Sequence, residues 1–285
     1  MTVTGDIFDR AARRYRRDRA APGYQEHDFL RRHMLDGIEE RLDTVTRAFT
    51  DVLDIGSFAG DFTLPGARIA RLDPGMRFAA CAGGVPGGVQ GDEDRLPFAD
   101  GAFDLVVSAG LLDQTNDLPG ALTLIRRTLR PDGLFMAAFL GAGSLAALRA
   151  ALRTAEADRP VARLHPQIDL RSAGDLLTRA GFALPVADSE TLAVRYAGLG
   201  RLLDDLRGMA ANNMLVQRTG LTRVTLAAAA EAFAALADAD GRTTERFEIV
   251  YLTGWAPDAS QPRPARRGSA TTSLATALTK ARGST

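Results

Sequence analysis

The residues that could do chemistry begin in a short glycine-bearing segment, VLDIGSFAG at residues 52–60. An apolar run that ends in glycine is typical of a buried parallel strand followed by a tight turn. In an open parallel sheet, ligands bind beyond the carboxyl ends of the strands, and glycine lets a ligand approach the backbone. Gly56 and Gly60 are therefore candidates for a ligand loop, together with Asp54 and Ser57. The glycine pair alone indicates a ligand loop and a plain turn about equally.

The spacing of these glycines disfavours a dinucleotide ligand. The NAD fingerprint has the spacing GxGxxG and opens a helix, whereas the spacing here is GxxxG. Pro65 and Gly66 also interrupt any helix that follows the turn. The pattern therefore does not predict NAD binding.

Acidic residues follow the glycine segment in an order that suits a nucleoside. Asp73 comes directly after the next expected strand, where a carboxylate can accept hydrogen bonds from both ribose hydroxyls. Asp92, followed by Glu93 in GDEDRLPF, could accept from an exocyclic adenine amine. Each aspartate alone is more often a surface turn residue. Their order after the glycine segment is what predicts a nucleoside site.

Other catalytic arrangements have little support. The three histidines are too scattered for a ligand set, so no metal is expected. Ser57 does not match the G-x-S-x-G pattern of a nucleophile elbow. Lys280 is the sole lysine, which disfavours Schiff-base chemistry and a Walker-type phosphate site.

The elements that must position these residues alternate between short apolar runs and amphipathic stretches. This alternation predicts an α/β fold with a doubly wound, mostly parallel sheet. Strands are expected at 51–55, 68–72, 104–109, 134–139, about 182–195 and 246–255, and helices at about 28–49, 117–129, 144–157, 172–180, 198–214 and 222–237. We divide the chain into N-terminal helices at 1–49, a sheet domain at 50–257 with a helical cap at about 198–240, and a flexible tail at 258–285.

The first helix, expected over residues 7–19, carries six arginines. Ile7, Ala11 and Tyr15 fall on one helical stripe, and the arginines lie elsewhere. The pattern favours a helix packed through that stripe, with its arginine face in solvent. A membrane-binding or partner-binding arm is the weaker interpretation, because three aspartates dilute the charge.

Composition limits the partners and the compartment. The 285 residues contain 35 Lys and Arg and 35 Asp and Glu, so the net charge is zero. No overall electrostatic attraction therefore favours binding to nucleic acid. No apolar run is long enough to span a bilayer, although peripheral association stays open. Cys81 is the only cysteine, so an internal disulfide is excluded and the cytoplasm is expected. The oligomeric state is not predicted.

Three segments together resemble the class I S-adenosylmethionine (SAM)-dependent methyltransferases. They are VLDIGSFAG, GDEDRLPFADGAFDLVVSAG and NDLPGALTLIRRTLRPDGLF, within residues 50–140. The N-terminal FDRAARRYRRDRAA and the C-terminal FEIVYLTGWAPDASQPRPARRGSATTSLATAL resemble, more narrowly, bacterial relatives of mitochondrial complex I assembly factor 5. Only residues 61–91 are available for two helices and two strands of that fold, so one or both helices should be shortened or lost.

This resemblance implies SAM as cofactor. Gly56 and Gly60 would approach its amino-acid part, Asp73 would hold the ribose, and Asp92 with Glu93 would hold the adenine. It also implies a complex I subunit as partner and either methyl transfer or arginine hydroxylation as activity. The alternative is a non-catalytic assembly factor that uses the same fold as a binding surface.

Four further residues are candidates for contact with the acceptor. Asp113 follows the fourth strand of the resembled fold, where LDQT replaces a His/Asn-Trp pair that is common in the family. Arg207, Asn212 and Asn213 belong to the expected cap, for which a solvated helix face is the competing interpretation. No catalytic base is assigned from the sequence.

Overall fold

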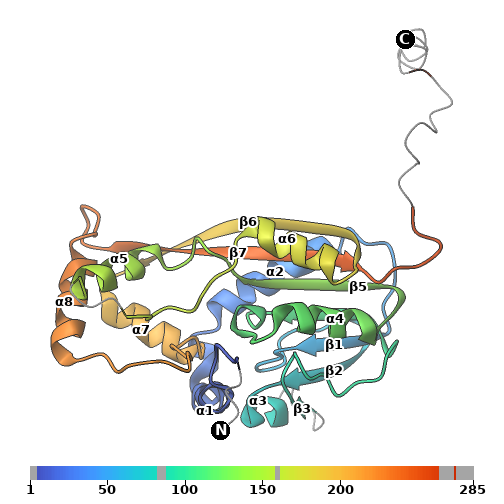
Figure 1. The fold of residues 1–285 in the computed structure, drawn as a ribbon, viewed down its shortest axis with the longest axis horizontal. Coiled ribbons are helices and arrows are strands. Elements are labelled where there is room, and N and C mark those ends of the chain that lie inside the picture. Colours follow the sequence, from blue (N-terminus) through green and yellow to red (C-terminus); the bar gives the residue numbers. More distant parts are fainter. Residues whose placement is uncertain (1–4, 82–87, 158–160, 263–272, 274–285) are drawn as a thin grey trace.

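The computed structural model describes residues 5–81, 88–157, 161–262 and 273. A single mixed sheet runs through the molecule, with helices on both of its faces (Figure 1). In chain order the elements are α1 (Arg10–Ala20), η1 (Ala21–Glu26), α2 (Phe29–Leu42), β1 (Asp51–Ile55), β2 (Arg68–Asp73), α3 (Met76–Cys81), β3 (Val89–Gln90), β4 (Phe103–Ala109), η3 (Leu112–Gln114), α4 (Leu118–Thr128), β5 (Leu129–Leu140), α5 (Ala146–Ala155), α6 (Leu170–Arg179), β6 (Ala183–Tyr196), α7 (Leu199–Gly208), α8 (Arg223–Ala234) and β7 (Thr243–Trp255).

The sheet has seven strands in the order β3-β2-β1-β4-β5-β7-β6. Strands β1 to β5 pair in parallel, and β7 pairs antiparallel with both β5 and β6. This confirms the doubly wound, mostly parallel sheet expected from the sequence. The strand order reverses between β1 and β4, which makes the carboxyl edge of these two strands the expected ligand site.

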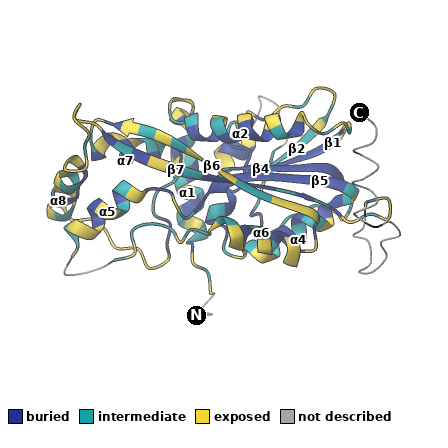
Figure 2. Ribbon diagram, turned by 90° about the horizontal axis from the view of Figure 1, so that it is seen from above, coloured by how far each residue is buried: buried dark blue, intermediate teal, exposed yellow. Residues whose placement is uncertain are grey.

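The central strands are buried on both faces because their side chains alternate between two apolar layers. In β5, Leu134 and Met136 pack with α2 and the cap, while Phe135 and Ala137 pack with α4 and α6. Figure 2 shows α2 and the pair α4 and α6 on opposite sides of the strands. This two-sided burial explains why these strands read as nearly continuous apolar runs.

Most element boundaries agree with the sequence to within a few residues, but two helices end earlier than expected. Helix α2 ends at Leu42 rather than near 49, just before the β-branched run at 44–46, which is unfavourable in a helix. Helix α7 ends at Gly208 rather than 214, and Ala210 then adopts a left-handed φ of +59°. The short strand β3 was not predicted as a separate element.

The segment between β1 and β3 is reduced, as the sequence indicated. Residues 56–67 contain no helix, and α3 is a single short helix between β2 and β3. Helix α1 packs beside α3 and thereby enters the space next to the glycine loop. The N-terminal helix therefore takes a place near the predicted cofactor site.

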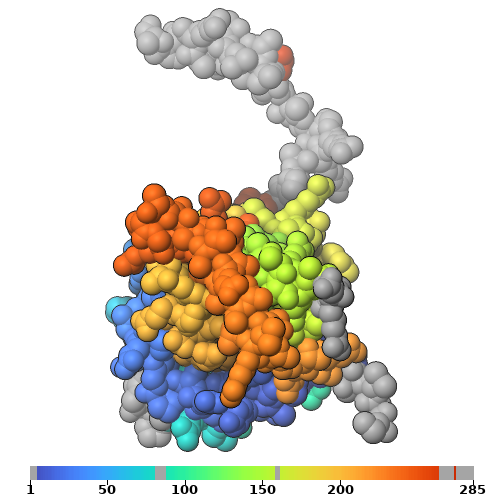
Figure 3. Space-filling view, turned by 90° about the vertical axis from the view of Figure 1, so that its left-hand side faces the viewer, coloured from blue at the N-terminus to red at the C-terminus, as the bar shows by residue number. Residues whose placement is uncertain are grey.

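Helices α7 and α8, which fall within the expected cap, contact each other at the end of the sheet, and α8 also packs against α5 (Figure 3). Helix α1, in blue, lies directly below them in that view. Within the described residues, no helix is both long and apolar enough to cross a membrane. Of the predicted flexible tail, residues 263–272 and 274–285 lie outside the described part.

Candidate cofactor and acceptor site

The glycine loop after β1 adopts a conformation that requires glycine. Gly56 and Gly60 have φ angles of +75° and +81°, in the left-handed region. The Gly56 N–H donates to the carbonyl of Leu72 at 2.7 Å, which holds the loop against the end of β2. A side chain at Gly56 would place its Cβ 2.8 Å from Leu111. Ser57 is fully buried, and its Oγ has no partner among the described residues.

Asp73, at the end of β2, is held by both the backbone and an arginine. It accepts hydrogen bonds from the N–H groups of Phe58 at 3.0 Å and Gly75 at 2.7 Å. Arg17 of α1 donates from Nε to Oδ1 at 2.8 Å and from Nη2 to Oδ2. Both charged side chains are 0% exposed, and the guanidinium lies 3.8 Å from the centre of the Phe58 ring. The carboxylate predicted to hold a ribose therefore holds a guanidinium in this conformation.

The carboxylates after β3 are paired with the same helix. Glu93 accepts from both Nη atoms of Arg13 at 2.9 and 2.7 Å, and both side chains are almost fully buried. Asp92 accepts from Arg14 Nη2 at 2.5 Å. The neighbouring carboxylate completes the set, because Asp94 accepts two bonds from Arg10.

These contacts overturn the predicted orientation of the first helix. The arginines at 10, 13, 14 and 17 lie at i, i+3, i+4 and i+7, so they share one helix face, and that face points inward. Ile7 and Tyr15 of the predicted apolar stripe are instead 46% and 64% exposed. The buried carboxylates need partners more than the few apolar side chains of α1 need burial.

A fifth arginine, Arg31 of α2, donates hydrogen bonds to the glycine loop. Its role was not identified from the sequence. It donates to the carbonyls of Gly56 at 2.7 Å, Ala109 at 2.6 Å and Ser57 at 3.2 Å. Its Nη2 lies 3.5 Å from Asp54, whose pKa is raised by burial despite this nearby charge. The arginines of α1 could have been found from their helical spacing, which places four of them on one face. A lone arginine such as Arg31 gives no comparable signal.

The carboxylates fit the polar groups of SAM by type and position, because they accept hydrogen bonds at the carboxyl edge of the sheet. Each is nevertheless paired with α1. The cavity beside Phe58 and Gly110 measures only about 30 Å³, roughly the space of one water molecule. SAM carries a sulfonium cation and cannot share a carboxylate with Arg17 without like-charge repulsion. Its binding would therefore require α1 to give up ion pairs.

The four candidate acceptor residues lie together around a second cavity. Asp113, Arg207, Asn212 and Asn213 all line a cavity of about 400 Å³ beneath the cap. Burial raises the pKa of Asp113 to about 6. A carboxylate with this pKa, next to the glycine loop, suits an exchange of protons with a bound acceptor near neutral pH.

The histidines serve separate local contacts. His165 Nε2 accepts from the N–H of Met214 at 2.9 Å, and burial lowers its pKa to about 4. His27 contacts Asp205, and His33 contacts Glu190. Across residues 5–81, 88–157 and 161–262, no group of three or more His, Cys, Asp or Glu side chains is arranged to hold a metal ion.

Comparison with known proteins identifies the family. Residues 53–137 match the family model described as a methyltransferase domain. The chain is 34% identical to the human protein named arginine-hydroxylase NDUFAF5, mitochondrial, over 95% of this chain and 83% of that protein. It is 33% identical to the malonyl-[acyl-carrier protein] O-methyltransferase of Laribacter hongkongensis, over 86% of this chain and 89% of that protein.

Solved structures support the same fold. The YcgJ protein of Bacillus subtilis covers 80% of this chain with a TM-score of 0.56 at 16% identity, and all of its own chain is matched. A putative methyltransferase of Bacillus halodurans covers 77% with a TM-score of 0.55 at 14% identity, and 98% of its chain is matched. The fold is that of the class I SAM-dependent methyltransferases, and the chain belongs to the family that includes the mitochondrial arginine hydroxylase NDUFAF5.

Proposed function

We propose that this protein binds SAM at the glycine loop and uses it to modify a protein or small-molecule acceptor held under the cap. The observation that carries this proposal is spatial. Gly56, Asp73 and Asp92 meet at the carboxyl edge of the sheet, and Asp113 connects this edge to the larger cavity. SAM would supply a methyl group activated by its sulfonium leaving group.

The roles of the predicted residues follow from their places. The backbone at Gly56 and Gly60 would face the amino-acid part of SAM, with Asp54 and Ser57 at the base of the same loop. A second set would hold the nucleoside, with Asp73 at the ribose. Asp92 and Glu93 would hold the adenine.

We propose further that α1 controls admission of the cofactor. In the closed conformation Arg17 occupies Asp73, the predicted ribose carboxylate, so the helix must withdraw at least this side chain before SAM binds. Isothermal titration calorimetry with SAM tests binding directly. Micromolar affinity that is lost in Asp73→Asn, with retained helical circular dichroism, supports the proposal, whereas no heat of binding up to millimolar SAM opposes it.

The biological setting that we propose is the assembly of respiratory complex I, with a complex I subunit as partner. The name of the NDUFAF5 relatives suggests arginine hydroxylation as an alternative reaction on the same fold. We place the protein in the cytoplasm, since its only cysteine cannot form an internal disulfide. Mass spectrometry of complex I subunits from a strain that lacks the gene should reveal a missing modification.

A non-catalytic assembly factor is the competing function, and the arginine-occupied carboxylates are the observation in its favour. Family membership weighs against it. The partner-binding arm, the weaker interpretation of the first helix, also loses two of its arginines, because Arg13 and Arg17 are buried. If complex I fails to assemble while all subunit modifications persist, the non-catalytic function is correct.

A further inference from the structure

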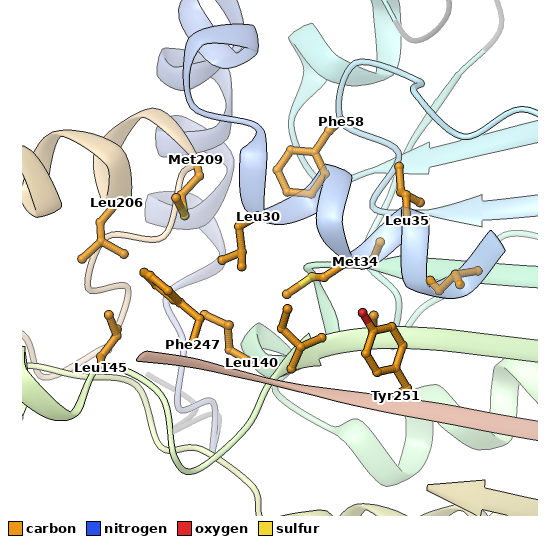
Figure 4. Close-up of a cluster of buried hydrophobic side chains, with 14 of the residues drawn as sticks. Leu30, Met34, Leu35, Phe58, Leu140, Leu145, Leu206, Met209, Phe247 and Tyr251 are labelled. Atoms are coloured by element: carbon orange, nitrogen blue, oxygen red, sulfur yellow. The ribbon is translucent and has the colours of Figure 1, made fainter. Parts of the chain in front are cut away.

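The cavity beneath the cap has apolar walls. Its volume of about 400 Å³ is within the range of small-molecule pockets, about 300–1,000 Å³. Ten leucines line it, contributed by β5, α5, α7, α8 and the connecting segments. Leu145 and Leu206 project toward one another across this region in Figure 4, with Leu140 nearby at the end of β5. Such walls are suited to a hydrocarbon group and are poorly suited to ordered water.

Two polar residues mark where the cavity meets the glycine loop, and the other polar residues of its lining include Arg163, His165, Gln167, Arg207, Asn212, Asn213 and Thr219. Asp113 and Gln114 line both this cavity and the small one beside Phe58 and Gly110. Arg16 of α1 also lines the larger cavity. The leucines therefore form most of the apolar wall, and Asp113 and Gln114 supply the acceptors next to the proposed cofactor loop.

The charges of the lining select the head of a ligand. Asp113 is the sole carboxylate among the described lining residues, and the buried Oε1 of Gln114 has no hydrogen-bond partner. Both are acceptors that suit a hydroxyl donor. Arg16 donates to the carbonyl of Asn213, and among the described residues it forms no ion pair with a carboxylate. The lining holds three arginines, Arg16, Arg163 and Arg207, against one carboxylate, which disfavours a guanidinium head, and a carboxylate head placed against Asp113 would be repelled by it.

We propose that this cavity binds an amphiphilic acceptor with an apolar tail and a neutral, hydroxyl-bearing head. The tail lies among the leucines of the cap, and the hydroxyl lies against Asp113 and Gln114. This inference rests on the proposed function, because the hydroxyl would thereby face the glycine loop. It assigns a ligand class distinct from an arginine side chain.

A series of alkylphenols tests the tail, with the full-length protein and without SAM. Calorimetry should show that affinity rises about fourfold for each added methylene between 4-ethylphenol and 4-octylphenol, which corresponds to about 0.8 kcal/mol per buried CH₂. At pH 7.5, octylguanidinium and octanoate share the apolar tail but carry opposite charges, and each should bind at least tenfold more weakly than 4-octylphenol. Affinity independent of tail length, or tighter binding of either charged amphiphile, would overturn the proposal.

A matched pair of variants locates the ligand. Leu203→Trp fills the cavity and should weaken 4-octylphenol binding at least tenfold, whereas Val224→Trp adds the same side chain to α8 at an 80% exposed position and should leave binding unchanged. Equal effects of the two variants would refute this placement. Because SAM is absent, a protein that binds octylphenol but not SAM retains this inference while losing the proposed function.

Discussion

Replacement of Arg17 by alanine should separate the stability of this protein from its affinity for SAM. Arg17 and Asp73 form a fully buried ion pair, so the variant leaves a buried carboxylate without its cation. Breaking a buried pair in this way costs about 3–5 kcal/mol. The carboxylate keeps two backbone donors, from Phe58 and Gly75, which favours the lower end of that range. At about 2–4 °C per kcal/mol, the Tm should fall by roughly 10 °C.

The same change should strengthen SAM binding. In the wild type, SAM must compete with Arg17 for Asp73. The measured Kd for SAM therefore equals the intrinsic Kd divided by the fraction of molecules in which α1 has withdrawn. If the ion pair stabilises the docked position of α1 by about 3 kcal/mol, its removal should lower the Kd for SAM about 100-fold. Saturating SAM should also raise the Tm of the variant more than that of the wild type.

Calorimetry and thermal unfolding monitored by circular dichroism measure the two effects in one preparation. Arg19→Ala is the matched control, since it removes one arginine from an exposed position of the same helix. It should change neither Tm nor SAM affinity appreciably. A folded Arg17→Ala protein that binds SAM no better than the wild type would refute the competition between α1 and SAM.

Three further predictions concern titration and packing. The pKa of Asp113 is raised from 3.8 to about 6, so the folded chain binds a proton more readily than the unfolded chain, and this contribution to stability is lost as pH rises through about 6. Asp113→Asn should remove this pH dependence of stability. In urea at pH 7, its free energy of unfolding should be about 1–2 kcal/mol higher than that of the wild type. The pKa of His165 is lowered from 6.5 to about 4, so its contribution is lost as pH falls through that interval, and His165→Gln should flatten the acid limb of the Tm profile. Gly37→Ala should cost about 1–3 kcal/mol in urea unfolding, because its Cβ would lie 2.3 Å from Tyr251 Oη. Its control, Gly200→Ala, meets nothing within 4 Å in α7 and should stabilise by about 0.5–1 kcal/mol.

The sheet could be predicted because its strands carry the information locally. The run at 104–109 is buried along its whole length, and its apolar centre, Leu105, Val106 and Val107, indicates a central strand. The position of Asp73 at the carboxyl edge also followed from the expected strands at 51–55 and 68–72, since parallel strands bring their carboxyl ends to one edge. These inferences needed no knowledge of distant contacts.

The docking of α1 could not be predicted in the same way. Amphipathic analysis assumes that the buried face of a helix is the apolar one. Here the buried face is basic because its partners are carboxylates distant in sequence, with Asp73 56 residues from Arg17 and Glu93 80 residues from Arg13. Charge pairing over such separations is set by the tertiary fold.

The charge balance of the arginine cluster argues that α1 opens only in part. Four arginines face four carboxylates in the closed conformation, so the cluster is neutral overall. SAM has a net charge of about +1 at neutral pH, from a sulfonium, an ammonium and a carboxylate. Exchanging all four guanidiniums for one such cation would leave several carboxylates uncompensated in a buried place, at a cost of several kcal/mol each.

An exchange limited to the inner end of the helix avoids this cost. Arg17 pairs with the predicted ribose carboxylate Asp73, whereas Arg10 at the other end pairs with Asp94, which has no predicted role toward SAM. Withdrawal of Arg17 alone would replace one cation by another and preserve neutrality. We therefore expect α1 to remain anchored through Arg10 while its C-terminal turn moves, since this motion exposes the ribose site without leaving the remaining carboxylates unpaired.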